Sequence, residues 1–149
     1  MADIKWSAYP SGGALVNSDI IVGLRNGLNY QFNAPTFDSQ IVVVNTPTQA
    51  MVTKTIYIVN DPISLVTLTL PSVSAIGDQL AIIGQSADLW TIAQQSGQQI
   101  FISPQHTTLG TMGTLSSTGQ YDSLVLICIA ANTLWTTFGS PQTTGLTFV

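Results

Sequence analysis

The sequence predicts an all-β fold, an antiparallel β-sandwich of jelly-roll-like topology with a small N-terminal β-hairpin segment. Three observations lead to this prediction. Nineteen of the 149 residues are Thr and none is Glu, so residues that suit a pleated sheet outnumber charged helix formers. Only 7% of residues are charged, whereas 45% are hydrophobic. Apolar residues recur with the two-residue period of strands, in short runs bounded by Gly, Pro, Asn and Asp.

A turn-rich segment, residues 1–35, precedes the main domain. Within it, Asn26-Gly27 is a strong signal for a two-residue hairpin turn that joins Ile20–Leu24 to Leu28–Phe32. Pro35 lies in a linker that we take as the boundary, because a new series of apolar runs begins a few residues later. We therefore expect a hairpin segment over 1–35 and a β-sandwich domain over 36–149.

The first half of the main domain contains apolar runs at Gln40–Asn45, Met51–Asn60 and Ser64–Leu70. The stretch Gly77–Ile102 then holds three short alternating runs, separated by the turn clusters 84–88 and 94–97. We predict that these three runs form an antiparallel meander. Trp90 lies on the central run and is expected to anchor the core.

The second half has fewer and longer features. His106–Gln120 is rich in Gly, Thr and Ser, and it predicts a long loop with one short strand at Met112–Leu115. Tyr121–Ala131 is a continuous apolar run, the pattern of a strand buried on both faces. Leu134–Phe138 predicts a strand with Trp135 in the core, and Leu146–Val149 predicts a last short strand.

Charge and composition exclude several classes of partner. A net charge of −4 with three cations gives too few positive groups to bind nucleic acid. No apolar run approaches the roughly 20 residues of a spanning helix, so membrane insertion is not expected. Cys128, alone in an apolar run, predicts a small buried side chain compatible with synthesis in a reducing cytoplasm. So little charge favours a surface that is partly buried in a stable oligomer.

The titratable residues do not form a recognisable catalytic pattern. Most of the seven Asp residues occur in turn dipeptides such as Asp61-Pro62 and Gly77-Asp78, unlike a pair of carboxylates facing one groove. His106, the single His, lies in a Thr-rich loop and is expected at the surface rather than in a triad. One His and one Cys do not supply an ordinary metal site. We expect a non-enzymatic protein without cofactor or metal.

Two loops are the candidates for contact with a partner or a glycan. Gln supplies donors and acceptors without charge, which suits sugar hydroxyls or ladders between chains, and equally suits solvated turns. The candidate residues lie in the stretches 94–99 and 107–120 and at the residue just before the second: Gln94, Gln95, Gln98, Gln99, His106, Thr107 and Thr108.

Two patterns resemble those of bacteriophage proteins. Residues 19–29 have the form D-x-x-V-G-x-R-x-G-x-N, which resembles a motif at the N-termini of many phage tail and fibre proteins. A second pattern covers about half the chain and resembles C-terminal modules of tail fibres and related virion proteins. It is carried by Leu70-Pro71, Gly77-Asp78, Trp90, Gln94, Gly97-Gln98, Asp122-Ser123, Cys128, Asn132 and Trp135.

The resemblance implies a structural protein of a phage virion, associated with a tail fibre or baseplate, that serves particle assembly or attachment to the host surface. Together with the low charge, it implies a homotrimer whose partners are its own copies, other virion proteins and host polysaccharide. The N-terminal segment would be an attachment element, with Trp6, Tyr9, Arg25, Asn26 and Tyr30 as its candidate residues. The alternatives are a head or capsid decoration protein (a head fibre), a polysaccharide-depolymerase fragment and a cellular lectin.

Overall fold

The chain consists of two units, Met1–Asp38 and Ser39–Val149. The structure, a computed structural model, describes residues 20–25, 28–33, 39–141, 143 and 145–149. In the first unit, β1 (Ile20–Arg25) and β2 (Leu28–Asn33) form an antiparallel pair in which Arg25 lies opposite Leu28. This pairing confirms the predicted hairpin strands, while the turn residues Asn26 and Gly27 lie outside the described residues. The predicted boundary after residue 35 falls inside the first unit.

The second unit is built from short strands. In chain order they are β3 (Gln40–Val44), β4 (Thr48–Ala50), β5 (Thr55–Val59), β6 (Val66–Thr69), β7 (Gln79–Gly84), β8 (Trp90–Ala93), β9 (Gln99–Ile102), β10 (Gln105–His106), β11 (Thr114–Ser117), β12 (Ser123–Ala130), β13 (Leu134–Thr137) and β14 (Leu146–Phe148). The described residues contain strands and turns but no helix, which confirms the all-β prediction.

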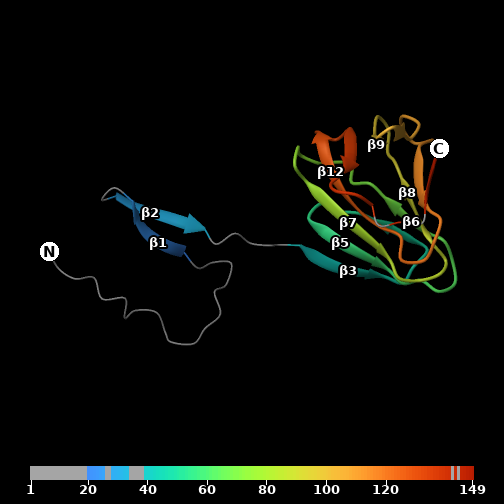
Figure 1. Cartoon of the computed structure of the whole chain (residues 1–149), viewed down its shortest axis with the longest axis horizontal. Helices are drawn as coiled ribbons and strands as arrows, with labels where there is room; N and C mark the ends of the chain where they lie inside the picture. The colour runs from blue at the N-terminus through green and yellow to red at the C-terminus, as the bar shows by residue number, and fades with distance from the viewer. Residues whose placement is uncertain (1–19, 26–27, 34–38, 142, 144) are drawn as a thin grey trace. The chain divides into compact units, whose positions relative to one another are not determined.

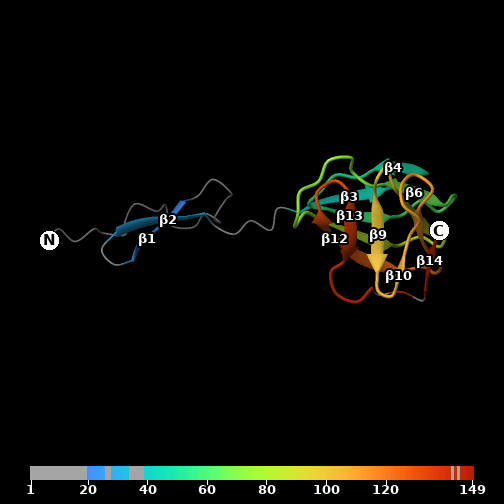
Figure 2. The same cartoon turned by 90° about the horizontal axis from the view of Figure 1, so that it is seen from above.

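These strands form two sheets. Among the described residues, one sheet has seven strands in the order β10-β9-β13-β12-β7-β5-β3, and the other has five in the order β14-β11-β8-β6-β4. Figure 1 shows β3, β5 and β7 side by side, and Figure 2 shows β9, β13 and β12 side by side. Buried residues from both sheets form one hydrophobic cluster, so the two sheets share a core.

The strands from β3 to β8 alternate between the two sheets along the chain. β3, β5 and β7 are parallel neighbours in the seven-stranded sheet, and β4, β6 and β8 are parallel neighbours in the five-stranded sheet. The chain therefore winds through both sheets as a coil. The direction reverses after it, because β12 is antiparallel to β7 and β11 is antiparallel to β8.

The prediction of purely antiparallel sheets is therefore wrong. The meander predicted for Gly77–Ile102 is wrong as well, since β7 and β9 belong to one sheet and β8 to the other. The parallel coil also differs from a jelly roll, which is made of antiparallel Greek keys. Periodicity misled the prediction because parallel and antiparallel ladders leave the same alternation of buried and exposed side chains. The intervening residues 85–89 and 94–98 carry the chain across to the opposite sheet.

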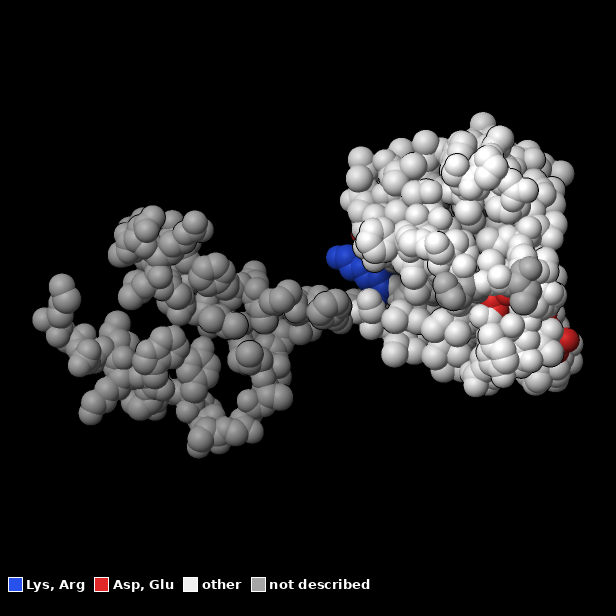
Figure 3. Space-filling view, in the orientation of Figure 1, with Lys and Arg blue, Asp and Glu red and all other residues white. Residues whose placement is uncertain are grey.

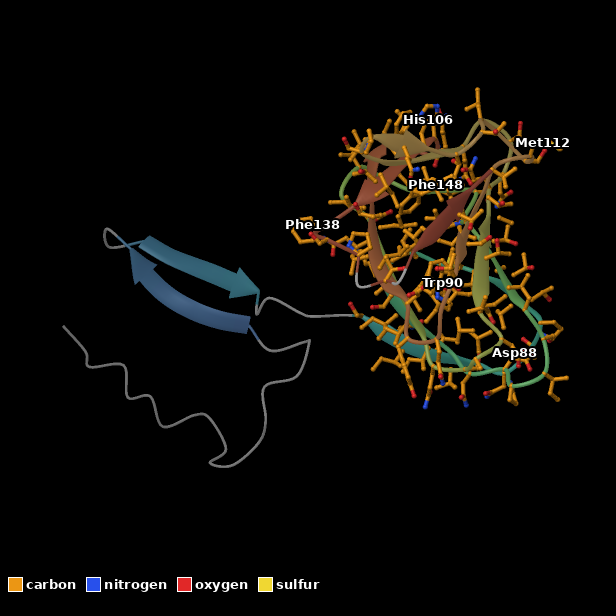
Figure 4. All side chains as sticks on the ribbon, turned by 45° about the vertical axis from the view of Figure 1, so that its right-hand side comes forward. Asp88, Trp90, His106, Met112, Phe138 and Phe148 are labelled. Carbon is orange, nitrogen blue, oxygen red and sulfur yellow. The ribbon has the colours of Figure 1, made fainter. Side chains whose placement is uncertain are left out.

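The core follows the inward parity of each strand. Trp90 and Trp135, predicted as anchors, are both fully buried, and Figure 4 shows Trp90 within the body of the unit. The indole Nε1 of Trp90 donates to the Asp122 carbonyl oxygen at 3.0 Å. Gly84 makes room for this ring, because a Cβ there would lie 3.0 Å from Trp90 Nε1. Sequence alternation was thus sufficient to identify both anchors.

Polar side chains bond to the backbone in several turns, including the predicted turn at Gly77-Asp78. Gly77 has a φ of +92°, which favours glycine, and Asp78 Oδ2 accepts a hydrogen bond from the Ala75 amide at 2.8 Å. Asn132 has a φ of 61°, and its side-chain oxygen accepts from the Ser74 amide at 2.7 Å. Asp122 Oδ2 accepts from the amides of Thr118 and Gly119, each at 2.8 Å. These polar residues hold turns between strands.

Replacing each of the two tryptophans by Phe should lower the free energy of unfolding by different amounts. Trp90 Nε1 has a hydrogen-bond partner, whereas Trp135 Nε1 is buried without one among the described residues. We expect Trp90→Phe to lower the free energy of unfolding by about 1 kcal/mol more than Trp135→Phe, because only the first substitution removes a hydrogen bond. Urea unfolding of both variants measures the difference. Equal losses would contradict this account of the two indoles.

Candidate interaction surfaces

Gln94 and Gln98 lie inside the fold rather than on a loop surface. Gln94 is 4% exposed and Gln98 is 1% exposed. The side-chain amide of Gln94 donates to the carbonyl oxygens of Gln98, Thr108 and Gly110, at 2.6, 2.9 and 3.1 Å. Its carbonyl oxygen accepts from the hydroxyl of Thr107, which is itself buried. These contacts join the turn after β8 to the loop that precedes β11.

The other glutamines of the cluster are used in the same way. Gln98 Nε2 donates to the Pro71 carbonyl at 2.8 Å, and Gln95 Nε2 donates to the Leu70 carbonyl at 2.7 Å. Gln99 Nε2 donates to the Thr107 carbonyl at 2.6 Å. The four amides therefore support the backbone of neighbouring loops. Gln94, Gln98 and Thr107 are buried, Gln95 and Gln99 are half-buried, and all five make internal hydrogen bonds, so we do not retain them as partner-facing groups.

Two of the predicted loop residues do reach the surface. His106 and Thr108 are exposed, and the imidazole of His106 stacks on the ring of Phe101 with a centroid distance of 5.4 Å. Figure 4 shows His106 and Met112 at one end of the unit, with Asp88 at the opposite end. An aromatic pair and a methionine side chain that is 74% exposed thus mark this end of the molecule.

The candidate attachment residues belong to the first unit. Arg25 is the last residue of β1, and Tyr30 lies on β2 opposite Gly23. Trp6, Tyr9 and Asn26 lie outside the described residues. Of the five candidates, the structure therefore describes the strand positions of Arg25 and Tyr30 only.

Several acidic residues and the cysteine have structural contacts. Asp61 is buried, and its two carboxylate oxygens accept from the Ile63 amide at 3.0 Å and the Ser64 hydroxyl at 2.9 Å. Cys128 is fully buried and its Sγ lies 3.3 Å from the Ser74 hydroxyl, which confirms the buried side chain predicted there. In the part of the chain that the structure describes, no three His, Cys, Asp or Glu residues are grouped to hold a metal ion.

A pocket of about 380 Å³ lies where β4 and β6 end. Nine residues line it, and none of them is ionisable: Ala50, Met51, Val52, Thr53, Leu70, Pro71, Ser72, Val73 and Gln95. The amide of Gln95 is already bonded to the Leu70 carbonyl. The pocket is therefore an uncharged hollow of mixed polar and apolar lining, without the acid or base that proton transfer requires.

The seven-stranded sheet carries an apolar outer face that sequence reasoning did not single out. We use the term outer face for the side chains that point away from the core along β3, β5, β7 and β12: Ile41, Val43, Ile56, Ile58, Gln79, Ala81, Ile83, Ser123, Val125, Ile127 and Ile129. The strand register aligns Val43, Ile58 and Ile83 in one row across three strands. A second row runs from Ile41 through Ile56 and Ala81 to Val125. Nine of these eleven side chains are hydrocarbon, and the other two, Gln79 and Ser123, are uncharged.

The five-stranded sheet has an outward side of opposite character. Its register aligns Thr48, Thr67, Thr91, Ser116 and Thr147 in one row across all five strands. Small hydroxyl side chains of this kind are ordinary on a solvated strand surface. The two sheets therefore expose different chemistry, hydroxyl groups on one side of the unit and hydrocarbon on the other.

Charge is nearly missing from the surface in view in Figure 3. Charged side chains occupy only a few small patches, and the remaining described surface in this view is uncharged. Within the described side chains Lys54 is the single cation, and it lies just before β5. Electrostatic attraction therefore has little to act on over the outer face.

No helix within the described ranges is long and apolar enough to cross a membrane. The chain matches no model of a known protein family, and a search of curated proteins finds no match either. The function is therefore inferred from the geometry of the second unit and from the sequence.

Proposed function

We propose that this protein is a non-enzymatic structural component of a bacteriophage virion, associated with a tail fibre or baseplate. It acts by binding, as part of particle assembly or of attachment to the host surface, and its working form is a homotrimer. The body that does this is a two-sheet β-sandwich whose loops are held by buried amides. The hairpin of the first unit is the attachment element.

The outer face of the seven-stranded sheet is the observation that carries this proposal. Contiguous exposed hydrocarbon on a sheet is typical of surfaces that another molecule covers. Ile41, Val43 and Ile83 are 65%, 50% and 41% exposed, although they lie on regular strands. A binding role uses this surface directly. The position in a virion rests on the two sequence patterns that resemble phage fibre proteins.

The side-chain chemistry favours binding over catalysis. Asp61, Asp78 and Asp122 accept hydrogen bonds from neighbouring backbone or hydroxyl groups within turns. A glycosidase needs two carboxylates on either side of a sugar ring, one acting as an acid and one as a base or nucleophile. The three carboxylates hold turns through these hydrogen bonds, so they do not favour the alternative hypothesis of a polysaccharide depolymerase.

Immunogold labelling of intact particles tests the position. Antibodies raised against the full chain are applied to particles of the phage that encodes it, and electron microscopy locates the gold. We expect label on the tail or baseplate. Label confined to the head would instead identify a decoration protein, and intact particles without label would contradict a virion role.

A viscosity assay tests the absence of catalysis. The full chain is incubated with capsular polysaccharide of the host, and the viscosity is followed beside a known depolymerase as positive control. We expect the viscosity to stay at its starting value, because binding leaves the glycosidic bonds intact. A progressive fall would overturn the non-enzymatic assignment.

A further inference from the structure

The outer face is a continuous apolar patch that runs across four neighbouring strands. With strands about 4.8 Å apart and about 3.3 Å of rise per residue, four strands of five residues cover roughly 300 Å² in projection. This is the scale of the largest apolar patch that a typical monomer exposes, and such patches are often functional. The face includes β3, the last strand of the seven-stranded sheet in the described part of the chain, so it reaches an edge of that sheet.

The strands below this face have the composition of strands that are covered on both sides. In β5 and β12, Ile or Val stands at outward positions as well as inward ones: Ile56 and Ile58 on β5, and Val125 and Ile127 on β12. Near-continuous apolar runs are typical of sheets with both faces buried. The five-stranded sheet covers the inner face, and within the described residues the outer face is uncovered, with its outward side chains half-buried or exposed.

The lack of charge on the outer face and the symmetry of oligomers indicate which partner packs on it. A charged partner surface would lose hydration against these side chains without gaining an opposite charge, because the outer face has none. An uncharged apolar surface suits it, and this chain itself presents one. Two copies related by a symmetry axis can bring the same patch together, since hydrocarbon against hydrocarbon is self-complementary. The edge of β3 that has no neighbouring strand among the described residues lies beside that contact.

We infer that the outer face of the seven-stranded sheet is the surface on which a second copy of this chain packs. Ile41, Val43, Ile58 and Ile83 lie at its centre, and in a homotrimer three such faces enclose a shared apolar core. The inference deepens the proposed function, on which it rests only for the choice of a self-assembling protein. The hydroxyl surface of the five-stranded sheet stays exposed in this arrangement, available to other partners.

Three lysine variants of the full chain test the inference. Ile41→Lys and Ile83→Lys place a charge on the outer face, whereas Ile63→Lys places the same charge on the connection between β5 and β6, at a residue that is 87% exposed. Light scattering after size exclusion gives the mass of each at matched concentration. Circular dichroism verifies that each variant keeps its strands, and Ile41→Thr provides a milder change at the same position.

We expect the unmodified chain and Ile63→Lys to have a mass of three times 15.8 kDa. Ile41→Lys and Ile83→Lys should self-associate at least about a hundredfold more weakly, because an unpaired charge would be buried, and Ile41→Thr should weaken association less. A dimer that the two face variants dissociate would support the interface and contradict the trimer. A monomeric unmodified chain, or an oligomer indifferent to both variants, would overturn the inference. Particle labelling would still decide the virion role independently.

Discussion

Replacing Gly113 by Ala should destabilise the second unit by about 3 kcal/mol, the largest effect that we expect from adding a single methyl group. Gly113 is buried, and a Cβ there would lie 2.5 Å from Gln94 Nε2 and closer still to the Thr108 carbonyl oxygen. A backbone oxygen cannot rotate aside as a side chain can. The loop that precedes β11 must therefore shift, and the bonds from Gln94 to Thr108 and Gly110 lengthen with it.

Thermal unfolding followed by circular dichroism measures this loss. A change of about 3 kcal/mol lowers the midpoint by about 10–15 °C for a unit of this size. Thr111→Ala, at an exposed position of the same loop, is the matched control and should shift the midpoint little. An unchanged midpoint for Gly113→Ala would mean that the loop has room that the structure does not show.

Gln94→Leu should cost about 3 kcal/mol by a different route. Leu has a similar volume, so the substitution removes the amide without leaving a large cavity. The carbonyls of Gln98, Thr108 and Gly110 then lose a donor, and the buried Thr107 hydroxyl loses its acceptor on Gln94. Buried polar groups without partners cost about 1–3 kcal/mol each, and part of this is recovered where a carbonyl has a second donor.

The control for this substitution is Gln105→Leu, at an exposed residue of β10. Urea unfolding should show a large loss of stability for Gln94→Leu and a small change for Gln105→Leu. Since the network ties the turn after β8 to the loop before β11, proteolysis should cleave the Gln94→Leu variant first within residues 107–113. Equal stability of the two variants would show that the Gln94 amide contributes nothing to the fold.

The buried glutamines explain why sequence reasoning misjudged this region. Gln94 and Gln98 stand in a turn cluster with Ser96 and Gly97, a composition that normally indicates solvent exposure. Their burial depends on carbonyl groups of Pro71, Thr108 and Gly110, which come from distant parts of the chain. No pattern in the nearby sequence predicts hydrogen bonds to these distant carbonyl groups. The Thr and Gly content of 107–113 was typical of a loop. The structure adds the hydrogen bonds from the Gln94 amide that hold this loop in place.

The sequence indicates the outer face most clearly on one strand, where apolar residues follow one another without alternation. The continuous apolar run at Tyr121–Ala131 predicted burial on both faces, and the structure buries the inward positions of β12 while leaving Val125 and Ile127 half-buried. The same pattern occurs in Gln40–Val44 and Thr55–Val59. Only the register shows that these strands lie within one sheet, where their outward side chains join into rows.

The sequence by itself determined the all-β class, the hairpin of the first unit, the two tryptophan anchors, the buried cysteine and the turn at Gly77-Asp78. All of these follow from local rules, because alternation, turn propensity and side-chain size act within a few residues. The tertiary structure alone decided which strands are neighbours, that β3 to β8 form a parallel coil, and that Gln94 and Gln98 are buried. Those features depend on contacts between segments far apart in the chain, and the two-residue period of a strand carries no information about the identity of its neighbour.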